Sequence, residues 1–382
     1  MRYRTLGKTG IEISEISLGC EGFLGDTPEH TKEIIDEAIK SGINAIDVYS
    51  SDPEMRRNIA AALGDRRKDF IIGSHLCAVW TGDQYMNTKD LELTKRGFED
   101  MLTDFGTDYI DIGMIHLVDS DKTWNEVLDN GVLDYAEELK KEGKIRHIGF
   151  SSHNPKVALK AVETGRFEVM LFCVNPCYDL QPASENVADI WADEAYEGHL
   201  TNMDPDRKKL YERCEEMDIA ITVMKCYAGG DLLDASVSPA GAALTPVQCI
   251  SYSLTRPSVR AVMLGIRSKE QLHEALAYET ASDEEKDYAT ALATFPRISW
   301  EGHCMYCGHC APCPVGIDVA SVTRLMNLAK AKGSVSETVS EHYKELSAHA
   351  GDCIQCGACE SRCPFSVSSV ANMAEAAEMF GY

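Results

Sequence analysis

The stretch HCMYCGHCAPCPVGID, residues 303–318, decides the architecture of this chain. It places four cysteines at intervals of three residues and follows the last one with Pro314. A second run, CIQCGACESRCP at residues 353–364, repeats this arrangement, except that three residues instead of two precede its last cysteine. Eight of the 15 cysteines therefore form two groups of four, while the other seven are scattered.

The spacing of these eight cysteines indicates metal binding. Two CxxC pairs can wrap a tetrahedral zinc ion, so two zinc sites are the alternative. A third cysteine at the same spacing, followed by Cys-Pro, is instead typical of bacterial ferredoxins, in which the fourth cysteine of each run ligates the other cluster. We predict two 4Fe-4S clusters. Their ligand sets are Cys304, Cys307, Cys310 and Cys363 for one, and Cys353, Cys356, Cys359 and Cys313 for the other.

The composition excludes several classes of partner. The 382 residues carry 37 basic and 61 acidic side chains, a net charge of -24, which repels nucleic acid and anionic membrane surfaces. No apolar run of about 18 residues is present. The start, MRYRTLGKTG, lacks the apolar core of a secretion signal, so we expect a cytoplasmic protein with reduced cysteines. The scattered cysteines are expected to pack in the core.

The residues before the cysteine runs alternate between strand-like and amphipathic segments. The strand-like segments are EISLG, NAIDV, DFIIGSHL, YIDIGMIHL, HIGFSS, VMLFCVN, IAITVMKC and AVMLGI, and a helix-like segment follows each of them. Eight such units of similar length predict an α/β fold, a (β/α)8 TIM barrel. We place the barrel in residues 1–290 and a helical two-cluster ferredoxin-type domain in residues 291–382.

Polar side chains gather where the predicted strands end. They are Asp47, His75, His116, Ser151, Ser152, Asn175 and Lys225. Each one alone has an ordinary explanation as a helix cap or a hydrogen-bonded packing residue. Because chemistry in a TIM barrel is placed at the carboxyl ends of the strands, we expect the seven to converge on one pocket.

Five stretches resemble the aldo-keto reductase family, and more narrowly its bacterial branch with a ferredoxin extension. They are RYRTLGKTGIEISEISLG, TDYIDIGMIHL, GKIRHIGFSSHNP, ITVMKCYAGGDLL and PSVRAVMLGIRSKEQLHEAL. Active members of the family reduce carbonyls with NAD(P)H through an Asp, Tyr, Lys and His tetrad. The resemblance implies the fold, an oxidoreductase activity and a small-molecule substrate.

The match to that tetrad is incomplete. Asp47 and His116 occupy the Asp and His positions, but Asp52 stands where the family has Tyr, and His75 where it has Lys. Tyr49 lies three residues before the expected Tyr position and is a candidate for the phenol. We predict that Asp47, Asp52, His75 and His116 perform proton chemistry. The alternative for Asp52 is a helix N-cap, because SSDPE is also typical of a helix start.

Further residues are candidates for binding NADP(H). Gly229 and Gly230 leave room for a pyrophosphate against backbone amides, and Arg267, Ser268 and Lys269 offer groups for a 2'-phosphate. The resemblance assigns Ser151 and Ser152 to the nicotinamide amide and Glu274 to the adenine. We count Asn175 and Lys225 among the cofactor-binding residues as well.

Three functions remain open on the sequence alone. The first is an NADP(H)-binding oxidoreductase, of the kind found in anaerobic metabolism, whose barrel is coupled to two 4Fe-4S clusters and possible redox-protein partners. The second is a barrel that has lost hydride transfer and serves in electron transfer or binding. The third is acid-base chemistry, such as elimination or isomerisation. Two stretches stay unassigned, residues 78–90 and 175–204, and loops of the latter length are usually functional.

Overall fold

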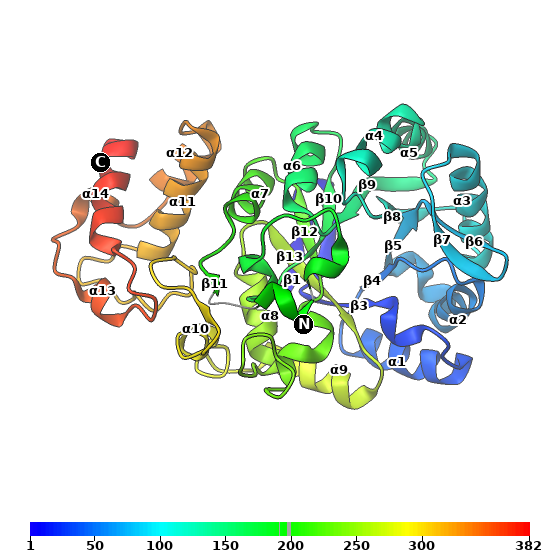
Figure 1. The fold of residues 1–382 in the computed structure, drawn as a ribbon, viewed down its shortest axis with the longest axis horizontal. Helices are drawn as coiled ribbons and strands as arrows, with labels where there is room; N and C mark the ends of the chain where they lie inside the picture. The colour runs from blue at the N-terminus through cyan, green and yellow to red at the C-terminus, as the bar shows by residue number, and fades with distance from the viewer. Residues whose placement is uncertain (191, 197–199) are drawn as a thin grey trace.

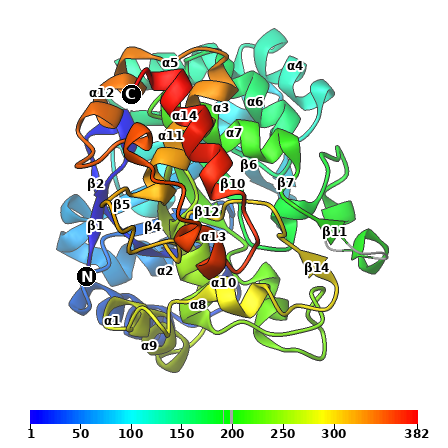
Figure 2. The same ribbon diagram turned by 90° about the vertical axis from the view of Figure 1, so that its left-hand side faces the viewer.

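The computed structural model describes residues 1–190, 192–196 and 200–382. Figure 1 shows a large part with a ring of strands inside a ring of helices, and a smaller part at the left formed by the C-terminal helices. Seen from that side, α11 and α14 lie in front of the ring (Figure 2). Within the described residues, no helix has the length and apolarity needed to cross a membrane.

Eight parallel strands close a barrel in chain order, each paired with the next and the last with the first. They are β3 Ile16–Gly19, β4 Ala45–Val48, β5 Ile71–Leu76, β8 Ile110–Ile115, β9 Ile145–Ser152, β10 Val169–Cys173, β12 Ala220–Met224 and β13 Val259–Gly265. All eight coincide with strands predicted from hydrophobic periodicity. The predicted (β/α)8 barrel is therefore confirmed.

Helices surround the barrel. They are α1 Pro28–Lys40, α2 Pro53–Leu63, α3 Leu91–Phe105, α4 Asp121–Asp129, α5 Val132–Lys141, α6 Pro155–Glu163, α7 Pro205–Glu216, α8 Pro246–Leu254 and α9 Lys269–Leu276. Five of them begin with a side-chain cap followed by proline, which satisfies free amides and fixes the first turn. At these five helices, the cap and the proline fix the residue at which the preceding loop ends and the helix begins.

A hairpin closes the amino end of the barrel. Strands β1 Tyr3–Thr5 and β2 Glu12–Ser14 pair in antiparallel fashion ahead of the first barrel strand. Leu6 and Ile13 are fully buried and pack against apolar side chains of the barrel strands. Since apolar side chains fill this end, the opposite, carboxyl end is left for a site.

Two insertions extend the carboxyl end. The first is a hairpin of β6 Ala78–Thr81 and β7 Gln84–Asn87, whose turn residues Gly82 and Asp83 both have positive φ, as in a type I′ turn. The second follows β10 and includes the short strand β11 Leu200–Thr201, which pairs with β14 Ile298–Ser299. This pairing ties the long loop of the barrel to the segment that leads into the C-terminal domain. Residues 191 and 197–199 of that loop lie outside the described residues.

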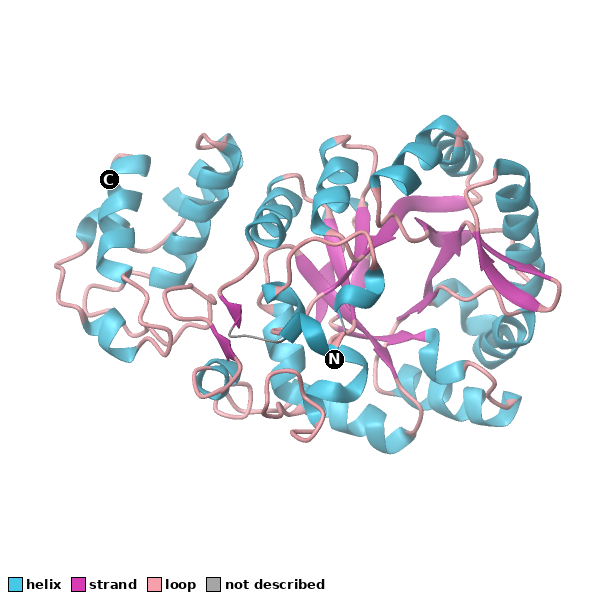
Figure 3. Ribbon diagram, viewed as in Figure 1, coloured by secondary structure: helices cyan, strands magenta, loops and turns pink. Residues whose placement is uncertain are grey.

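The C-terminal domain is helical, in contrast to the strand-rich barrel (Figure 3). Its helices are α10 Tyr288–Leu292, α11 Val319–Lys332, α12 Glu337–Lys344, α13 Ala358–Arg362 and α14 Ser369–Phe380. Helix α11 packs on α14 within the domain and on α7 of the barrel, so it joins the two parts. The predicted boundary after residue 290 falls within α10 and stays a prediction.

Candidate functional site

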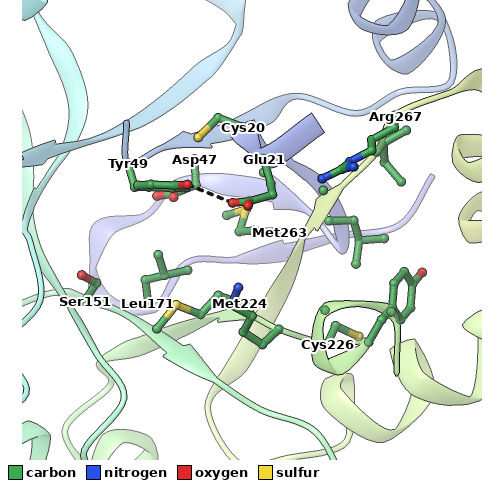
Figure 4. Close-up of a pocket in the computed structure, with 18 of the residues that line it drawn as sticks. Cys20, Glu21, Asp47, Tyr49, Ser151, Leu171, Met224, Cys226, Met263 and Arg267 are labelled. Atoms are coloured by element: carbon green, nitrogen blue, oxygen red, sulfur yellow. Dashed lines mark hydrogen bonds between the residues drawn. The ribbon is translucent and has the colours of Figure 1, made fainter. Parts of the chain in front are cut away.

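A cavity of about 620 Å³ opens at the carboxyl end of the barrel strands. Figure 4 shows side chains from opposite sides of the barrel pointing into it, among them Asp47, Ser151 and Met224. The volume lies in the range of pockets that enclose small organic ligands. The lining combines apolar side chains with many polar and charged ones, so the cavity can enclose a small ligand and also orient it by hydrogen bonds.

Four polar side chains of this cavity form a continuous chain of hydrogen bonds. His75, fully buried on β5, lies between Asp47 and His116. Its Nε2 is 3.2 Å from Asp47 Oδ1, and its Nδ1 is 2.6 Å from His116 Nδ1. The other ring nitrogen of His116, Nε2, is 2.5 Å from the hydroxyl of Tyr85. The chain therefore connects a buried carboxylate on β4 to a phenol on the β6–β7 hairpin. We call these four residues the relay.

Hydrogen-bonding capacity fixes the direction of the protons in the relay. An ionised Asp47 can only accept, so His75 Nε2–H donates to it and His75 Nδ1 becomes an acceptor. His116 Nδ1–H then donates to His75, which leaves His116 Nε2 to accept from the Tyr85 hydroxyl. In this state every proton of the relay points toward Asp47. The oxygen of Tyr85 keeps lone pairs for a group in the cavity.

The surroundings keep His116 neutral, as this pattern requires. Burial lowers the pKa of His116 well below its ordinary value, and the positive charge of Lys89 adds to the effect. Lys89 is itself buried and donates from Nζ to the His116 carbonyl oxygen at 2.6 Å. A neutral imidazole has one donor and one acceptor nitrogen, which is what a proton relay needs.

Tyr49 and Tyr85, two of the three tyrosines that line the cavity, remain protonated phenols at neutral pH. Tyr49 stacks on His116 with ring centroids 6.0 Å apart and donates its hydroxyl to Glu21 Oε2 at 2.9 Å (Figure 4). Burial raises the pKa of Tyr49 far above its ordinary value and raises that of Tyr85 to about 12. Both are therefore proton donors, and Tyr85 is the one joined to Asp47 through imidazoles.

Three predicted site residues bond to the protein's own backbone and do not line the cavity. Asp52 caps α2, and its Oδ1 accepts from the amides of Glu54 and Met55 at 2.8 and 3.2 Å. The helix-cap interpretation of Asp52 is thus confirmed. Ser152 Oγ donates to a backbone carbonyl at 2.7 Å, and Asn175 Nδ2 donates to the Lys225 carbonyl oxygen at 2.9 Å. Because these groups are engaged, any role in catalysis or cofactor binding remains a prediction.

The nucleotide candidates divide in the same way. Ser151, Lys225, Gly229, Gly230, Arg267 and Glu274 line the cavity. Both glycines have positive φ, and no atom lies within 4 Å of the position of an added Cβ, so their backbone offers an open cradle. Ser268 instead caps α9, and Lys269 pairs with Glu33 at 2.6 Å on the surface. Of the three residues predicted for the 2'-phosphate, Arg267 is therefore the one that lines the cavity.

Tyr85 and Lys89 are candidate residues that sequence reasoning missed. Both belong to the stretch AVWTGDQYMNTKD, residues 78–90, which stayed unassigned. Its Gly-Asp pair between two four-residue runs is a signal for a hairpin. The contact of Tyr85 with a histidine 31 residues away was not accessible from local pattern.

Seven of the eight cysteines of the C-terminal runs pack against one of two cores. Cys304, Cys307 and Cys363 pack against the core of the barrel, while Cys310, Cys313, Cys353 and Cys359 pack against the core of the helical domain. The first predicted ligand set is thus shared between the two cores, with Cys310 on the helical side. A small cavity of about 20 Å³ is lined by the thiols of one predicted ligand set. These are Cys313, Cys353, Cys356 and Cys359. The arrangement fits the crossed ligand pattern, in which Cys313 joins the second run.

The other predicted set also lies together. Cys307, Cys310 and Cys363 are the cysteines whose charges act on Cys304, and all of them raise its pKa in addition to the larger effect of burial. No three His, Cys, Asp or Glu side chains of the described residues are placed to hold a single ion. A cube of four irons and four sulfides sets its thiolates around a larger body than one ion does. The donor set therefore fits two such cubes.

The sequence matches two known families. Residues 15–243 match the aldo/keto reductase family, and residues 302–367 match a 4Fe-4S dicluster domain. An uncharacterised oxidoreductase of Bacillus subtilis, YqkF, is 28% identical over 290 residues, which cover 72% of this chain and 90% of that protein. A glyoxal reductase of the same organism is 31% identical over 163 residues, 40% of this chain and 52% of that protein.

Solved structures show the same fold. The aldo-keto reductase AKR11C1 from Bacillus halodurans, in its holo form, superimposes with a TM-score of 0.59 at 20% identity. The superposition covers 75% of this chain and 94% of that one. At this identity the likeness concerns the fold of the barrel and not its substrate.

Proposed function

The chain belongs to the aldo/keto reductase family, and on that premise we propose that it is an NADP(H)-linked oxidoreductase whose barrel cavity exchanges electrons with two 4Fe-4S clusters. The observation that carries the proposal is the relay, an unbroken series of hydrogen bonds from Asp47 to Tyr85 inside the cavity. It takes the place of the family's Tyr and Lys, which this chain lacks at the matching positions.

The relay accounts for the proton of the reaction. When a substrate alcohol is oxidised, its C–H bond gives up a hydride and its O–H bond gives up a proton. Tyr85 takes that proton on its oxygen and passes its own to His116 Nε2, and the shift continues through His75 to Asp47. Carbonyl reduction runs the same series backward, with Tyr85 as the proton donor. Each transfer moves one proton across one existing hydrogen bond, so charge is conserved along the relay.

Two cofactors complete the proposal. Bound NADP(H) supplies or accepts the hydride, with Gly229 and Gly230 as the cradle for its pyrophosphate and Arg267 as the partner of its 2'-phosphate. Each 4Fe-4S cluster would take up or release one electron, so two clusters could hold the two electrons of a hydride, whose proton would be released to solvent. The two cysteine sets described above would hold them.

A second candidate is acid-base catalysis without hydride transfer, as in an elimination or isomerisation. The observation that favours it is again the relay, because it can move a proton into or out of the cavity without a nucleotide. Under this alternative the clusters would be structural or serve another partner.

Anaerobic titration with NADPH, followed through the visible absorbance of the clusters, separates these candidates. We expect NADPH to bleach the clusters of the parent protein. His116→Ala should slow turnover with a small substrate by about a hundredfold or more, the usual scale of a lost acid-base group, and leave reduction by dithionite intact. The matched variant Asp52→Asn, at the cap of α2, should retain the turnover rate. Clusters that ignore NADPH while the barrel still converts a substrate would exclude the proposal in favour of acid-base catalysis.

Arg267 and Lys269 provide a matched test of the nucleotide. Arg267→Ala should weaken NADPH binding by about 1.5 to 3 kcal/mol and leave NADH nearly unchanged, because only NADPH has a phosphate to pair with it. Lys269→Ala, which removes a surface ion pair with Glu33, should alter neither. Isothermal titration calorimetry measures the affinity of each variant for NADPH and for NADH. Equal losses for NADPH and NADH would place the phosphate contact elsewhere.

A further inference from the structure

Arg256 lies just after the end of α8, between the barrel and the first cysteine run. Its side chain is 2% exposed. The guanidinium donates to the carbonyl oxygen of Met305, to the Tyr288 hydroxyl at 3.0 Å and to the Tyr252 carbonyl oxygen at 3.3 Å. Met305 stands between Cys304 and Tyr306, so the guanidinium touches the loop that carries two predicted cluster ligands.

Arg256 has no carboxylate partner among the residues that the structure describes. The acid that acts on it through space, Asp179, accepts from the hydroxyls of Tyr211 and Tyr252 and pairs with Arg207 at 3.6 Å. A buried cation without a counter-charge is costly. Its hydrogen bonds go to neutral oxygens, so the compensating negative charge must come from another group nearby.

The cysteine loop can supply that charge. Cluster-bound cysteines are thiolates, and a 4Fe-4S cluster with four thiolates is an anion whose charge grows by one on reduction. The hydrogen bond from Arg256 to the Met305 carbonyl oxygen places the buried cation beside this site, because Met305 directly follows Cys304 and lies two residues before Cys307. A buried positive charge beside the cluster favours its more negative, reduced state.

We infer that Arg256 is the buried counter-charge of the cluster held by Cys304, Cys307, Cys310 and Cys363, and that it raises the reduction potential of this cluster above that of the second one. The inference rests on the proposed function in that it takes both clusters to be present. Arg256 changes the reduction potential of the cluster through its charge and does not contact the reacting substrate. Electrons that enter the domain then collect at the cluster that packs on the barrel.

The fold places that cluster at the end of a helix that starts at the cavity. Pro246, the first residue of α8, lines the cavity, and Arg256 follows the last turn. Nine helical residues span about 14 Å.

Arg362 provides an internal control. It also donates to backbone carbonyl oxygens of the first run, those of Cys310 and Pro312, but its side chain is exposed. Solvent and salt screen an exposed charge far more than a buried one. Two arginines thus contact the same loop and differ in burial.

The test is a redox titration with dithionite and mediators, followed by electron paramagnetic resonance, on the anaerobic full-length protein. Arg256→Gln should lower the reduction equilibrium constant of one cluster by about tenfold or more, about 59 mV per factor of ten for one electron. Arg256→Lys and Arg362→Gln should each change it by less than about threefold. The shifted signal should be the one that Cys363→Ser perturbs.

Several results would overturn the inference. They are equal shifts for Arg256→Gln and Arg362→Gln, a shift in the signal that Cys356→Ser perturbs, and no shift at all. If Arg256→Gln loses iron, the redox titration of the parent protein tests the inference instead. The inference then fails if the cluster whose signal Cys356→Ser perturbs is the first to be reduced. The titration uses neither nucleotide nor substrate, so its result is independent of hydride transfer. Failure of NADPH to reduce either cluster would count against the proposed function alone.

Discussion

The two cysteine runs have the same local backbone but different surroundings. In both, the residue before the second cysteine has a left-handed conformation, with φ of 54° at Tyr306 and 55° at Gln355. Gly308 and Gly357 follow with φ of 83° and 71°. The spacing of the motif therefore dictates one loop shape twice.

The surroundings of the runs differ because only the first packs on the barrel. Met305 is 1% exposed, whereas Ile354, at the same position of the second run, is 61% exposed. Arg256 contacts the first run from inside the protein. The comparison teaches that a repeated motif fixes ligand geometry, while the packing around it decides charge and solvent access.

Substitution of the fourth cysteine of each run by serine tests the predicted ligand sets. We expect it to have the largest effect, because it should remove a whole cluster. Anaerobically prepared protein should contain roughly eight irons and eight sulfides per chain, and Cys363→Ser or Cys313→Ser should lose about half. Because the fourth cysteine of each run serves the other run, Cys363→Ser should destroy the cluster that packs on the barrel. Iron analysis and paramagnetic resonance measure both effects. Loss of the second cluster in Cys363→Ser would show that each run keeps its own four ligands. Two zinc ions per chain without sulfide would show that no iron-sulfur clusters are bound.

Truncation of the paired residues Met305 and Ile354 should have the next largest effect. Met305→Ala should lower the free energy of unfolding by about 2 to 5 kcal/mol, because it opens a cavity where the run packs on the barrel. Ile354→Ala should change it by less than about 0.5 kcal/mol, since that side chain is mostly in solvent. Anaerobic unfolding in urea, monitored by tryptophan fluorescence, gives the free energy of unfolding of both variants. Similar losses in both variants would mean that the second run is also covered.

A buried acid beside the first run should make stability depend on pH. Glu212 of α7 is 5% exposed, and burial raises its pKa to about 7 while Lys208 and Lys330 oppose the shift. Since the folded state binds the proton more tightly, stability falls as pH rises from about 4.5 to 7 and is then constant. Glu212→Gln should therefore stabilise the protein by up to roughly 3 kcal/mol above pH 7, with the gain vanishing below pH 5.

A neighbour on the same helix is the control for Glu212. Glu216 is ion-paired with Arg213 and Lys332, so Glu216→Gln should lose stability at neutral pH instead of gaining it. The midpoints of urea unfolding at several pH values report the stability of both variants. A gain for Glu212→Gln that is the same at pH 5 and pH 8 would exclude ionisation as its cause.

Local pattern was sufficient for the barrel and for the 4Fe-4S dicluster domain. Alternating strands and helices repeat every few tens of residues, and each strand could be found from its own apolar run, as for residues 110–115. The cysteine spacing likewise carries its chemistry locally. Both features depend on neighbours in sequence, which is why they could be read without a structure.

The proton relay and the buried arginine could not be found in this way. Tyr85 meets His116 only because a hairpin outside the barrel folds over the strand ends. The family position of the phenol pointed to Asp52 or Tyr49, and the role of Asp52 as a cap follows from the local SSDPE pattern. Arg256 is 49 residues from Met305 in sequence, and no periodicity relates them. These contacts arise from tertiary packing.

The β6–β7 hairpin has a consequence for how such a protein can change over evolutionary time. Within the described residues, the strand that carries the phenol of the relay pairs with its own hairpin partner, Trp80 opposite Tyr85, and with no barrel strand. An insertion, deletion or exchange between residues 78 and 87 can therefore remove, replace or reposition the proton donor without breaking the barrel ladder. We therefore expect changes in this loop to alter the proposed proton donor while Asp47, His75 and the strands that carry them keep their places.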